Sequence, residues 1–297
     1  MGSEEGWLSS MREVIKGNVL VLTVGMVIRQ LSLFITFPYF SLYVLALGGS
    51  KVDIGIVNSL RPLAAMFVYP IAGALADNYS RKRTLVVIGA VNAALFSVYM
   101  LAPDWRYLAA ASFFNGLLVF RFPASSALLA DSMEADARGR GFAAVTSLPA
   151  FFGILSPFLG GYLIETLGLV QAMRLLYGWT FLALTLITFI NWRYLDETLP
   201  EPHATRSDFI RIVGGAYRET LETLRWMPRE LKVYAVILVI SLFFNAFTGP
   251  FWVVYAEDAL GLRALDWGTL LTLATVIQVI LAIPAGNLID RRDKRKI

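Results

Sequence analysis

The chain has 297 residues, of which 57% are hydrophobic and 16% are charged, and its mean hydropathy is +0.62. A soluble domain of this length needs more surface charge, so the composition predicts an all-α integral membrane protein. The pI of about 9.3 comes from basic residues clustered between apolar stretches, a pattern typical of membrane loops and not of nucleic-acid binding. There is no cysteine, and the one histidine, His203, lies in a proline-rich loop, so no disulfide, metal site or cofactor is expected.

Eight apolar segments are each long enough to cross a membrane as a helix, for which about 20 residues are needed. They cover residues 18–47, 52–76, 84–102, 107–130, 142–164, 174–192, 233–255 and 268–288. Short polar turns join the first six, which predicts antiparallel neighbours. The expected organisation is a six-helix bundle in residues 1–195, a cytoplasmic linker in residues 196–231 and, in residues 232–297, the first two helices of a second, incomplete bundle.

The linker is rich in proline, glutamate and arginine, which sets it apart from the apolar segments on either side. Within it, apolar residues recur at helical spacing: Phe209, Val213, Ala216, Tyr217 and Leu224. Ser207 or Asp208 is a suitable N-cap and Pro228 a stop, so the pattern predicts a surface helix.

One polar stretch, residues 73–83, returns near the end of the chain as residues 286–296. In both copies a glycine lies four residues before an aspartate, and a basic residue lies four residues after it. The repeat continues upstream at almost the same separation, where Pro38 and Tyr43 recur as Pro250 and Tyr255. A repeat of this length built from hydrophobic spans predicts a duplicated membrane bundle.

We interpret the duplicated stretch as a conformational latch. Its residues are Gly73, Asp77, Arg81, Lys82, Asp290, Arg291 and Lys294. Gly73 would let two helices approach, and Asp77 would end a helix and pair with Arg81 or with the N-terminus of a neighbouring helix. Asp131, Glu134, Arg138 and Arg140 in a later turn are further candidate partners. The alternative is that Arg81, Lys82 and Arg83 only anchor the turn to anionic lipid headgroups.

The distribution of basic residues predicts the orientation. If the N-terminus is cytoplasmic, both signature turns and the linker are cytoplasmic, and the inner loops hold most of the lysines and arginines. The outer loops then hold only Lys51, Arg106, Arg174 and Arg263. We therefore expect a multi-pass protein of the plasma membrane with a cytoplasmic N-terminus.

The signature residues resemble those of the major facilitator superfamily of secondary transporters. That family carries a Gly-x-Leu-Ala-Asp-Arg-x-Gly-Arg-Lys pattern between helices 2 and 3, matched here by Gly73, Leu75, Ala76, Asp77, Arg81 and Lys82, with Asn78 and Ser80 replacing an arginine and a glycine. A degenerate copy between helices 8 and 9 is matched by Gly286, Leu288, Asp290 and Arg291. The resemblance implies alternating access without enzymatic chemistry.

The chain also departs from this family. Members with the signature usually have twelve helices, so we expect a chain truncated after helix 8 that lacks the C-terminal helices of the second bundle. The helix-packing residues Pro157, Gly160 and Gly161 resemble an antiporter motif, but Ser156 stands where that motif has glycine. Ser112 occupies the position of an antiporter arginine, so the resemblance favours efflux by antiport only mildly.

Three arginines, Arg29, Arg61 and Arg121, lie about ten residues from their predicted helix ends, which is about 15 Å deep. An arginine at this depth is costly and normally faces a polar interior, unless it snorkels or braces helix ends through carbonyls. Amide side chains lie in the same or other spans: Gln30, Asn58, Asn115, Asn245 and Gln278. Together these residues predict a cavity for an anionic or strongly polar organic solute.

The expected function is secondary active transport of a small organic solute, with membrane lipid and a coupling ion, H⁺ or Na⁺, as further partners. A drug or metabolite efflux antiporter for cationic or lipophilic compounds is the first alternative. A channel, receptor or assembly subunit is an alternative of another class. A membrane-embedded enzyme is not expected, because no carboxylate, cysteine or histidine lies well inside any span.

Overall fold

The computed structural model describes residues 15–135, 137–199 and 208–291. Within these ranges, eight helical segments are long and apolar enough to cross a membrane, which confirms the predicted all-α membrane fold. Their bounds are Gly17–Ala46, Lys51–Asn78, Arg81–Leu101, Trp105–Asp131, Gly141–Leu167, Leu169–Tyr194, Arg229–Asp258 and Ala264–Leu281. Each predicted span has a counterpart whose ends differ from the prediction by a few residues.

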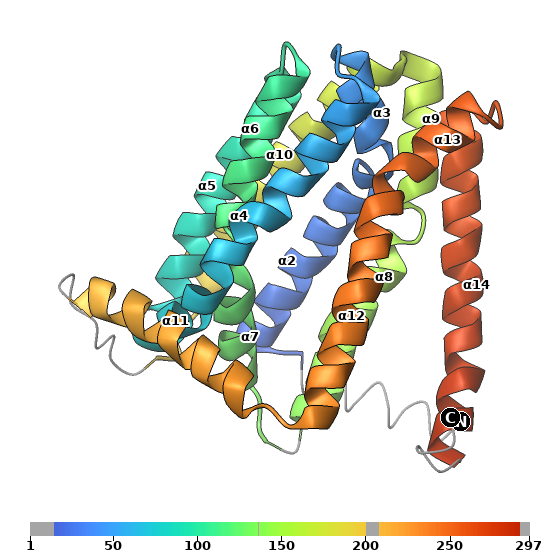
Figure 1. Ribbon diagram of the computed structural model, residues 1–297. Coiled ribbons are helices and arrows are strands. Elements are labelled where there is room, and N and C mark those ends of the chain that lie inside the picture. The colour runs from blue at the N-terminus through green and yellow to red at the C-terminus, as the bar shows by residue number, and fades with distance from the viewer. Residues whose placement is uncertain (1–14, 136, 200–207, 292–297) are drawn as a thin grey trace.

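The first six spans form one bundle (Figure 1). They comprise α2 (Gly17–Phe34), η1 (Phe37–Tyr39), α3 (Phe40–Ala46), α4 (Lys51–Asn78), α5 (Arg81–Leu101), α6 (Trp105–Leu117), α7 (Arg121–Asp131), α8 (Arg138–Gly153), α9 (Ser156–Leu167) and α10 (Leu169–Tyr194). Helix α10 packs along α5 and α2, and α4 packs along α6. We call the end that holds the α4–α5 turn the signature end, and the other end the opposite end.

The rest of the described chain contributes α11 (Asp208–Trp226), α12 (Arg229–Thr248), η2 (Gly249–Phe251), α13 (Trp252–Asp258) and α14 (Ala264–Arg291). Helix α14 packs along α9 and α13 contacts α3, whereas the described chain buries no residue of α12. The predicted surface helix is α11, which crosses the signature end and contacts α4 (Figure 1).

The predicted repeat is visible in the backbone. Helices α4 and α14 each have 28 residues, and their starts and ends are separated by the same interval as the two signature stretches. Pro38 and Pro250 each lie in a three-residue 3₁₀ segment, where a missing N–H interrupts the helix, and a seven-residue helix follows each segment. Gly48 and Gly261 then turn the chain with positive φ angles of 83° and 64°.

An aromatic cluster holds the opposite end of the first bundle together. Tyr99 stacks on Tyr177 with ring centroids 5.2 Å apart, and Phe96 contacts both rings. The Tyr43 hydroxyl donates a hydrogen bond to the Tyr99 carbonyl at 3.1 Å, and the Tyr99 hydroxyl bonds Ser112 at 3.0 Å. Because the buried hydroxyls of Tyr43 and Tyr99 are bonded, these rings pack without an unsatisfied donor. The cluster joins α3, α5, α6 and α10 at this end of the bundle.

Candidate functional site

A cavity of about 540 Å³ lies inside the first bundle, between α2, α4, α5, α6, α7 and α8. Many of its lining residues come from the parts of these helices nearer the signature end, such as Met26, Tyr69, Leu129 and Phe142. Its volume lies within the range typical of small-molecule sites.

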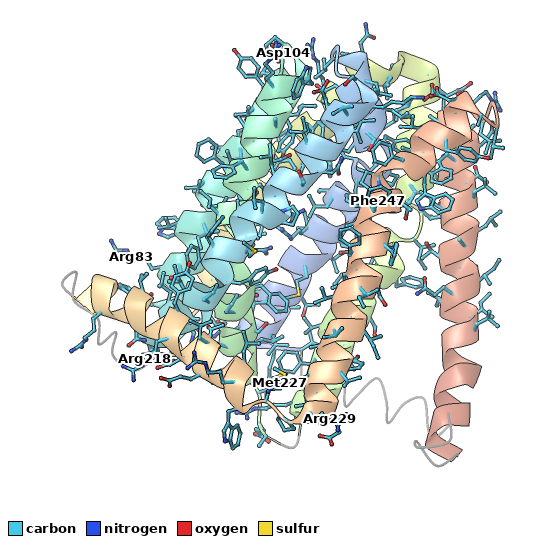
Figure 2. The ribbon with its side chains drawn as sticks, viewed as in Figure 1. Arg83, Asp104, Arg218, Met227, Arg229 and Phe247 are labelled. Carbon is cyan, nitrogen blue, oxygen red and sulfur yellow. The ribbon has the colours of Figure 1, made fainter. Side chains whose placement is uncertain are left out.

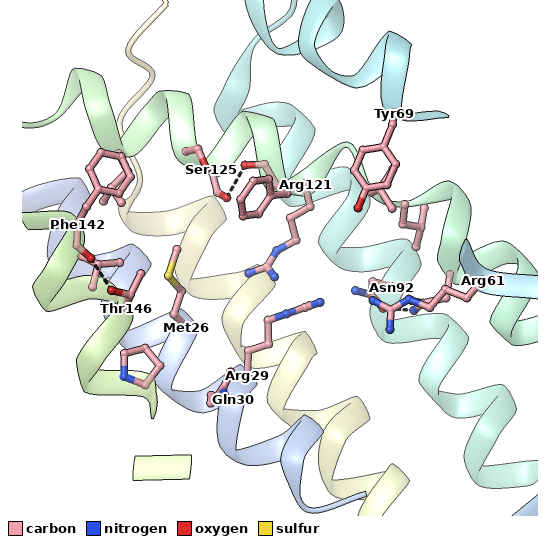
Figure 3. A pocket seen from close by; sticks show the side chains of 18 residues that line it. Met26, Arg29, Gln30, Arg61, Tyr69, Asn92, Arg121, Ser125, Phe142 and Thr146 are labelled. Carbon is pink, nitrogen blue, oxygen red and sulfur yellow. Dashed lines mark hydrogen bonds between the residues drawn. The ribbon is translucent and has the colours of Figure 1, made fainter. Parts of the chain in front are cut away.

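All three predicted arginines line the cavity: Arg29 from α2, Arg61 from α4 and Arg121 from α7. Figure 3 shows the Arg29 and Arg121 guanidinium groups turned toward one another, with Arg61 beside Asn92. Among the described residues, none of these three guanidinium groups has a hydrogen bond or an ion pair. The alternative, in which these arginines brace helix ends through carbonyls, has no such hydrogen bond in this part of the chain, and the three cations are available to a solute.

Amide groups add polarity to the same cavity. Gln30 and Asn115, both predicted, line it together with Asn92, which the sequence reasoning missed. The Asn115 Nδ2 donates to the Asn92 Oδ1 at 3.1 Å. Asn92 could have been found as the amide eight residues after Thr84, near the middle of its predicted span, at a depth similar to that of the arginines. The described residues that line the cavity include no aspartate or glutamate.

Three predicted cavity residues do not line the cavity. Asn58 is bonded to its own helix, because its Nδ2 donates to the Ile54 carbonyl at 2.8 Å. Asn245 and Gln278 are exposed on α12 and α14. Their helices belong to residues 229–291, which we call the second unit. Its described contacts with the first bundle concentrate at the opposite end, so these mid-helix positions stay away from the cavity.

The expected Asp77–Arg81 pair does not form in the α4–α5 turn. Helix α4 ends at Asn78, Tyr79 is extended, and α5 begins at Arg81, so the two residues are not on one continuous helix face. Asp77 is exposed. Arg81 is buried and forms an ion pair with Asp131 at the end of α7, one of the further candidate partners.

The start of the linker joins this network. Arg81 also donates to the Thr198 hydroxyl at 3.1 Å, and Glu197 accepts hydrogen bonds from the Ser80 hydroxyl and, at 3.1 Å, from the Lys82 N–H. Burial raises the pKa of the Glu197 carboxyl, but hydrogen bonds from Ser80, Leu199, Lys82 and Thr198 outweigh it, so the pKa lies below its ordinary value. Glu197 thus supplies negative charge at the N-terminus of α5, where the helix dipole favours it. The sequence carries no local signal for this contact, because the partners are 115 or more residues apart.

Two further predictions about the latch concern the packing of Gly73 and the second copy of the signature stretch. Gly73 is exposed, and no atom lies within 4 Å of a Cβ built on it, so no helix approaches it in the described chain. In the second copy, Asp290 and Arg291 fall in the last turn of α14, whereas Lys294 lies outside the described residues.

Pro157 and Gly161, two of the predicted packing residues, lie at a seam between α9 and α14 at the opposite end, which we call the glycine seam. The third, Gly160, faces Ile35 and Tyr39. A Cβ at Gly161 would lie 2.5 Å from the Ala264 carbonyl oxygen, and one at Gly160 would collide with the Ile35 carbonyl. The Tyr39 hydroxyl donates to the Pro157 carbonyl at 2.5 Å, so α9 and η1 meet at the same point. Glycine is needed here because the backbones approach more closely than any side chain permits.

Ion pairs at the same end link the first bundle to the second unit. Lys51 at the start of α4 pairs with Asp258 at the end of α13 at 2.7 Å. Arg263 pairs with Glu165 of α9 at 3.2 Å and with Asp266 at 3.1 Å. The contacts of α9 with α14 and these pairs therefore join the first bundle to the second unit at the opposite end.

A solved structure shares the fold described above. The chain superposes on the human organic anion transporter MFSD10 with a TM-score of 0.62 and 16% identity, covering 87% of this chain and 69% of that one. At this identity the likeness concerns the fold alone.

Sequence comparison finds bacterial relatives. The chain is 25% identical over 181 residues to the multi-drug resistance efflux pump PmrA of Streptococcus pneumoniae, and 28% identical over 177 residues to a PmrA homolog of Lactococcus lactis. These matches cover 59% and 58% of this chain but 45% and 44% of the relatives, so the chain spans less than half of their length. The family model described as Major Facilitator Superfamily matches residues 22–297. By this match over nearly its whole length, the chain belongs to the Major Facilitator Superfamily.

Proposed function

We propose that the protein is part or all of a secondary active transporter that carries a small anionic organic solute by alternating access. The observation that carries this proposal is the set of guanidinium groups from Arg29, Arg61 and Arg121, which line one cavity and have no partner among the described residues. Carboxylate or phosphate groups of a solute would supply the missing acceptors, because arginine binds both with paired, charge-assisted hydrogen bonds.

The contacts at the opposite end, which we take as its closure, support alternating access. The glycine seam and the ion pairs join the two units there, while the cavity reaches toward the signature end. In this arrangement a solute enters or leaves at the signature end. Membrane proteins with basic loops on one side place that side in the cytoplasm, so we place the signature end and the N-terminus there, in the plasma membrane.

The latch is proposed in a changed form. Arg81, Asp131, Glu197 and Thr198 join the α4–α5 turn, α7 and the linker, and we expect this network to bias the conformational equilibrium. Lys82 takes part through its backbone N–H, which donates to Glu197 at 3.1 Å.

The printed name of the bacterial relatives favours a second candidate, efflux of cationic or lipophilic compounds in exchange for H⁺. Three guanidinium groups would repel a cation, and no carboxylate that could offset their charge is found among the described residues that line the cavity. The described lining residues also offer no carboxylate that could take up H⁺ or bind Na⁺, so a coupling ion would depend on other groups.

Ligand binding to purified protein separates the candidates. A panel of dicarboxylates and phosphate esters is compared with a lipophilic cation such as tetraphenylphosphonium, by calorimetry in detergent. Replacing Arg29 or Arg121 by glutamine should weaken binding of the preferred anion about tenfold or more, from the loss of a charged hydrogen bond. Arg193→Gln is the matched control, because Arg193 is exposed beside the Tyr194 ring and outside the cavity.

Two results decide against an anionic solute. The first is a double variant, Arg29→Gln with Arg121→Gln, that binds every anion as the parent does. The second is tight binding of the lipophilic cation, which would make the cationic efflux pump the better account.

A further inference from the structure

Helix α11 carries a line of arginines along one side. Arg211, Arg218 and Arg225 recur every seven residues, and seven residues make almost two helical turns, so they form one stripe. Arg218 and Arg225 are exposed, and Arg218 pairs within its own helix, with Glu222 at 2.8 Å. Figure 2 places Arg218 at the same end of the molecule as Arg83 and Arg229.

An apolar face adjoins the stripe. At 100° per residue, Tyr217, Leu221 and Leu224 fall on one side of α11, and Leu221 lies next to Arg225 around the helix. Part of this face rests on α4, because Ala216 is buried and the Tyr217 hydroxyl donates to the Phe67 carbonyl. The C-terminal part is uncovered: Leu221 is 62% exposed and Leu224 is 52% exposed.

The attachment of α11 limits what this face can reach. Only Met227 and Pro228 separate its end from α12, which is a candidate membrane span, and α10 ends another span upstream. Trp226, at the junction, is 87% exposed, and tryptophan is favoured at the membrane–water interface. The uncovered leucines are thus held at the level of the headgroups, and the basic stripe lies along the boundary between apolar and polar faces. This is the layout of a helix that lies in the membrane surface.

We propose that α11 binds anionic phospholipids, with the phosphate groups held by Arg211, Arg218 and Arg225 and with Leu221 and Leu224 inserted at the acyl boundary. Charge complementarity selects this occupant, because guanidinium groups bind phosphate in a paired geometry and Glu219 lies on the side of the helix away from the leucines. Glu222 lies within the stripe and accepts from the Arg218 Nε, so the two terminal nitrogens of Arg218 are the ones that would bind a phosphate. Arg229 and Lys232 are both exposed at the start of α12, and the Lys232 Nζ donates to the Arg225 carbonyl at 3.1 Å, so further basic groups adjoin the end of the stripe. The proposal is independent of which solute the cavity binds.

The absence of cysteine from the sequence allows a site-specific probe. Leu221→Cys, labelled with a polarity-sensitive fluorophore on the full chain in detergent, is titrated with short-chain phosphatidylglycerol or phosphatidylcholine. Phosphatidylglycerol should shift the emission to the blue at lower concentration than phosphatidylcholine. Each Arg→Gln replacement in the stripe should weaken the phosphatidylglycerol response about fivefold, the equivalent of about 1 kcal/mol per basic residue, and leave the phosphatidylcholine response unchanged.

The matched control is a variant that changes a different charge on α11. Glu219→Gln removes a charge from the same helix and should not weaken the response, and unchanged thermal unfolding shows that each variant is folded. Equal responses to the two lipids, or a triple Arg→Gln variant that behaves as the parent, would overturn the proposal. A shift with soluble glycerol phosphate would indicate a phosphate site without a membrane, and a label that is shielded before lipid is added would indicate a protein cover. Either result also overturns it.

Discussion

Gly161 offers a direct test of whether the seam between α9 and α14 holds the opposite end closed. In Gly161→Ala the new Cβ would lie 2.5 Å from the Ala264 carbonyl oxygen, 2.7 Å from the Tyr39 hydroxyl and 2.9 Å from the Leu265 Cα. Two of these atoms are backbone, so α14 must move away. Overpacking of this kind costs about 1–3 kcal/mol, which corresponds to about a five- to 150-fold change in an equilibrium constant. We therefore expect a measurable population in which the two units have separated at this end.

Distance measurement between two spin labels reports that population. Thr166→Cys on α9 and Leu260→Cys in the α13–α14 turn are exposed and lie on the two sides of the seam. The matched control is Gly55→Ala in α4, where no atom lies within 4 Å of the new Cβ. Both substitutions gain the same helix propensity, so their difference isolates the steric effect. If Gly161→Ala gives the same distance distribution and the same melting temperature as Gly55→Ala, the seam does not control closure.

Other predictions follow from the ion pairs. Arg81→Gln and Asp131→Asn should each lower the free energy of unfolding by about 1–3 kcal/mol, because the ion pair joins a buried arginine to an aspartate whose side chain is only 42% exposed. In a double-mutant cycle followed by thermal unfolding, the double variant should lose less than the sum of the two single losses. Since the pKa of Glu197 is lowered, the stability that its contact contributes is present at neutral pH and is lost as the pH falls through that lowered pKa, below the ordinary value of about 4.3. Glu197→Gln should remove this acid-dependent loss from a series of melting temperatures measured against pH. An unchanged loss in the variant would refute the assignment to Glu197. Lys51→Gln should change the separation of the spin labels less than Gly161→Ala does, because the exposed Lys51–Asp258 pair contributes at most about 1 kcal/mol; an equal or larger change would show that the pair dominates closure.

The spans and the repeat could be predicted because they depend on local patterns. A run of about twenty apolar residues defines a membrane helix wherever its partners lie. The constant separation of the two signature copies is enough to relate α4 to α14, and the paired prolines Pro38 and Pro250 mark both interruptions without knowledge of any contact. Arg29, Arg61 and Arg121 could be placed in one cavity because a deep charge must face a polar interior.

The contacts of the signature turn could not be predicted in the same way. The Asp77–Arg81 expectation assumed a helical spacing of four residues, whereas Tyr79 is extended and ends that spacing. Asp131 and Glu197 reach the turn only through the packing of α7 and α10. The same reason explains the wrong placement in the cavity of Asn58, Asn245 and Gln278. The depth of a residue in a span does not determine which side of its helix it occupies or where that helix lies.

Helix α14 can act as a lever on the seam. Its 28 residues make a rod about 42 Å long, and the tight backbone contacts found in the described chain involve Ala264, Leu265 and Gly268, within its first five residues. A rotation of about 10° around that fulcrum would move the far end of the rod by about 7 Å. A shift of about 1 Å across the contact residues is thereby amplified into an opening as wide as a small molecule.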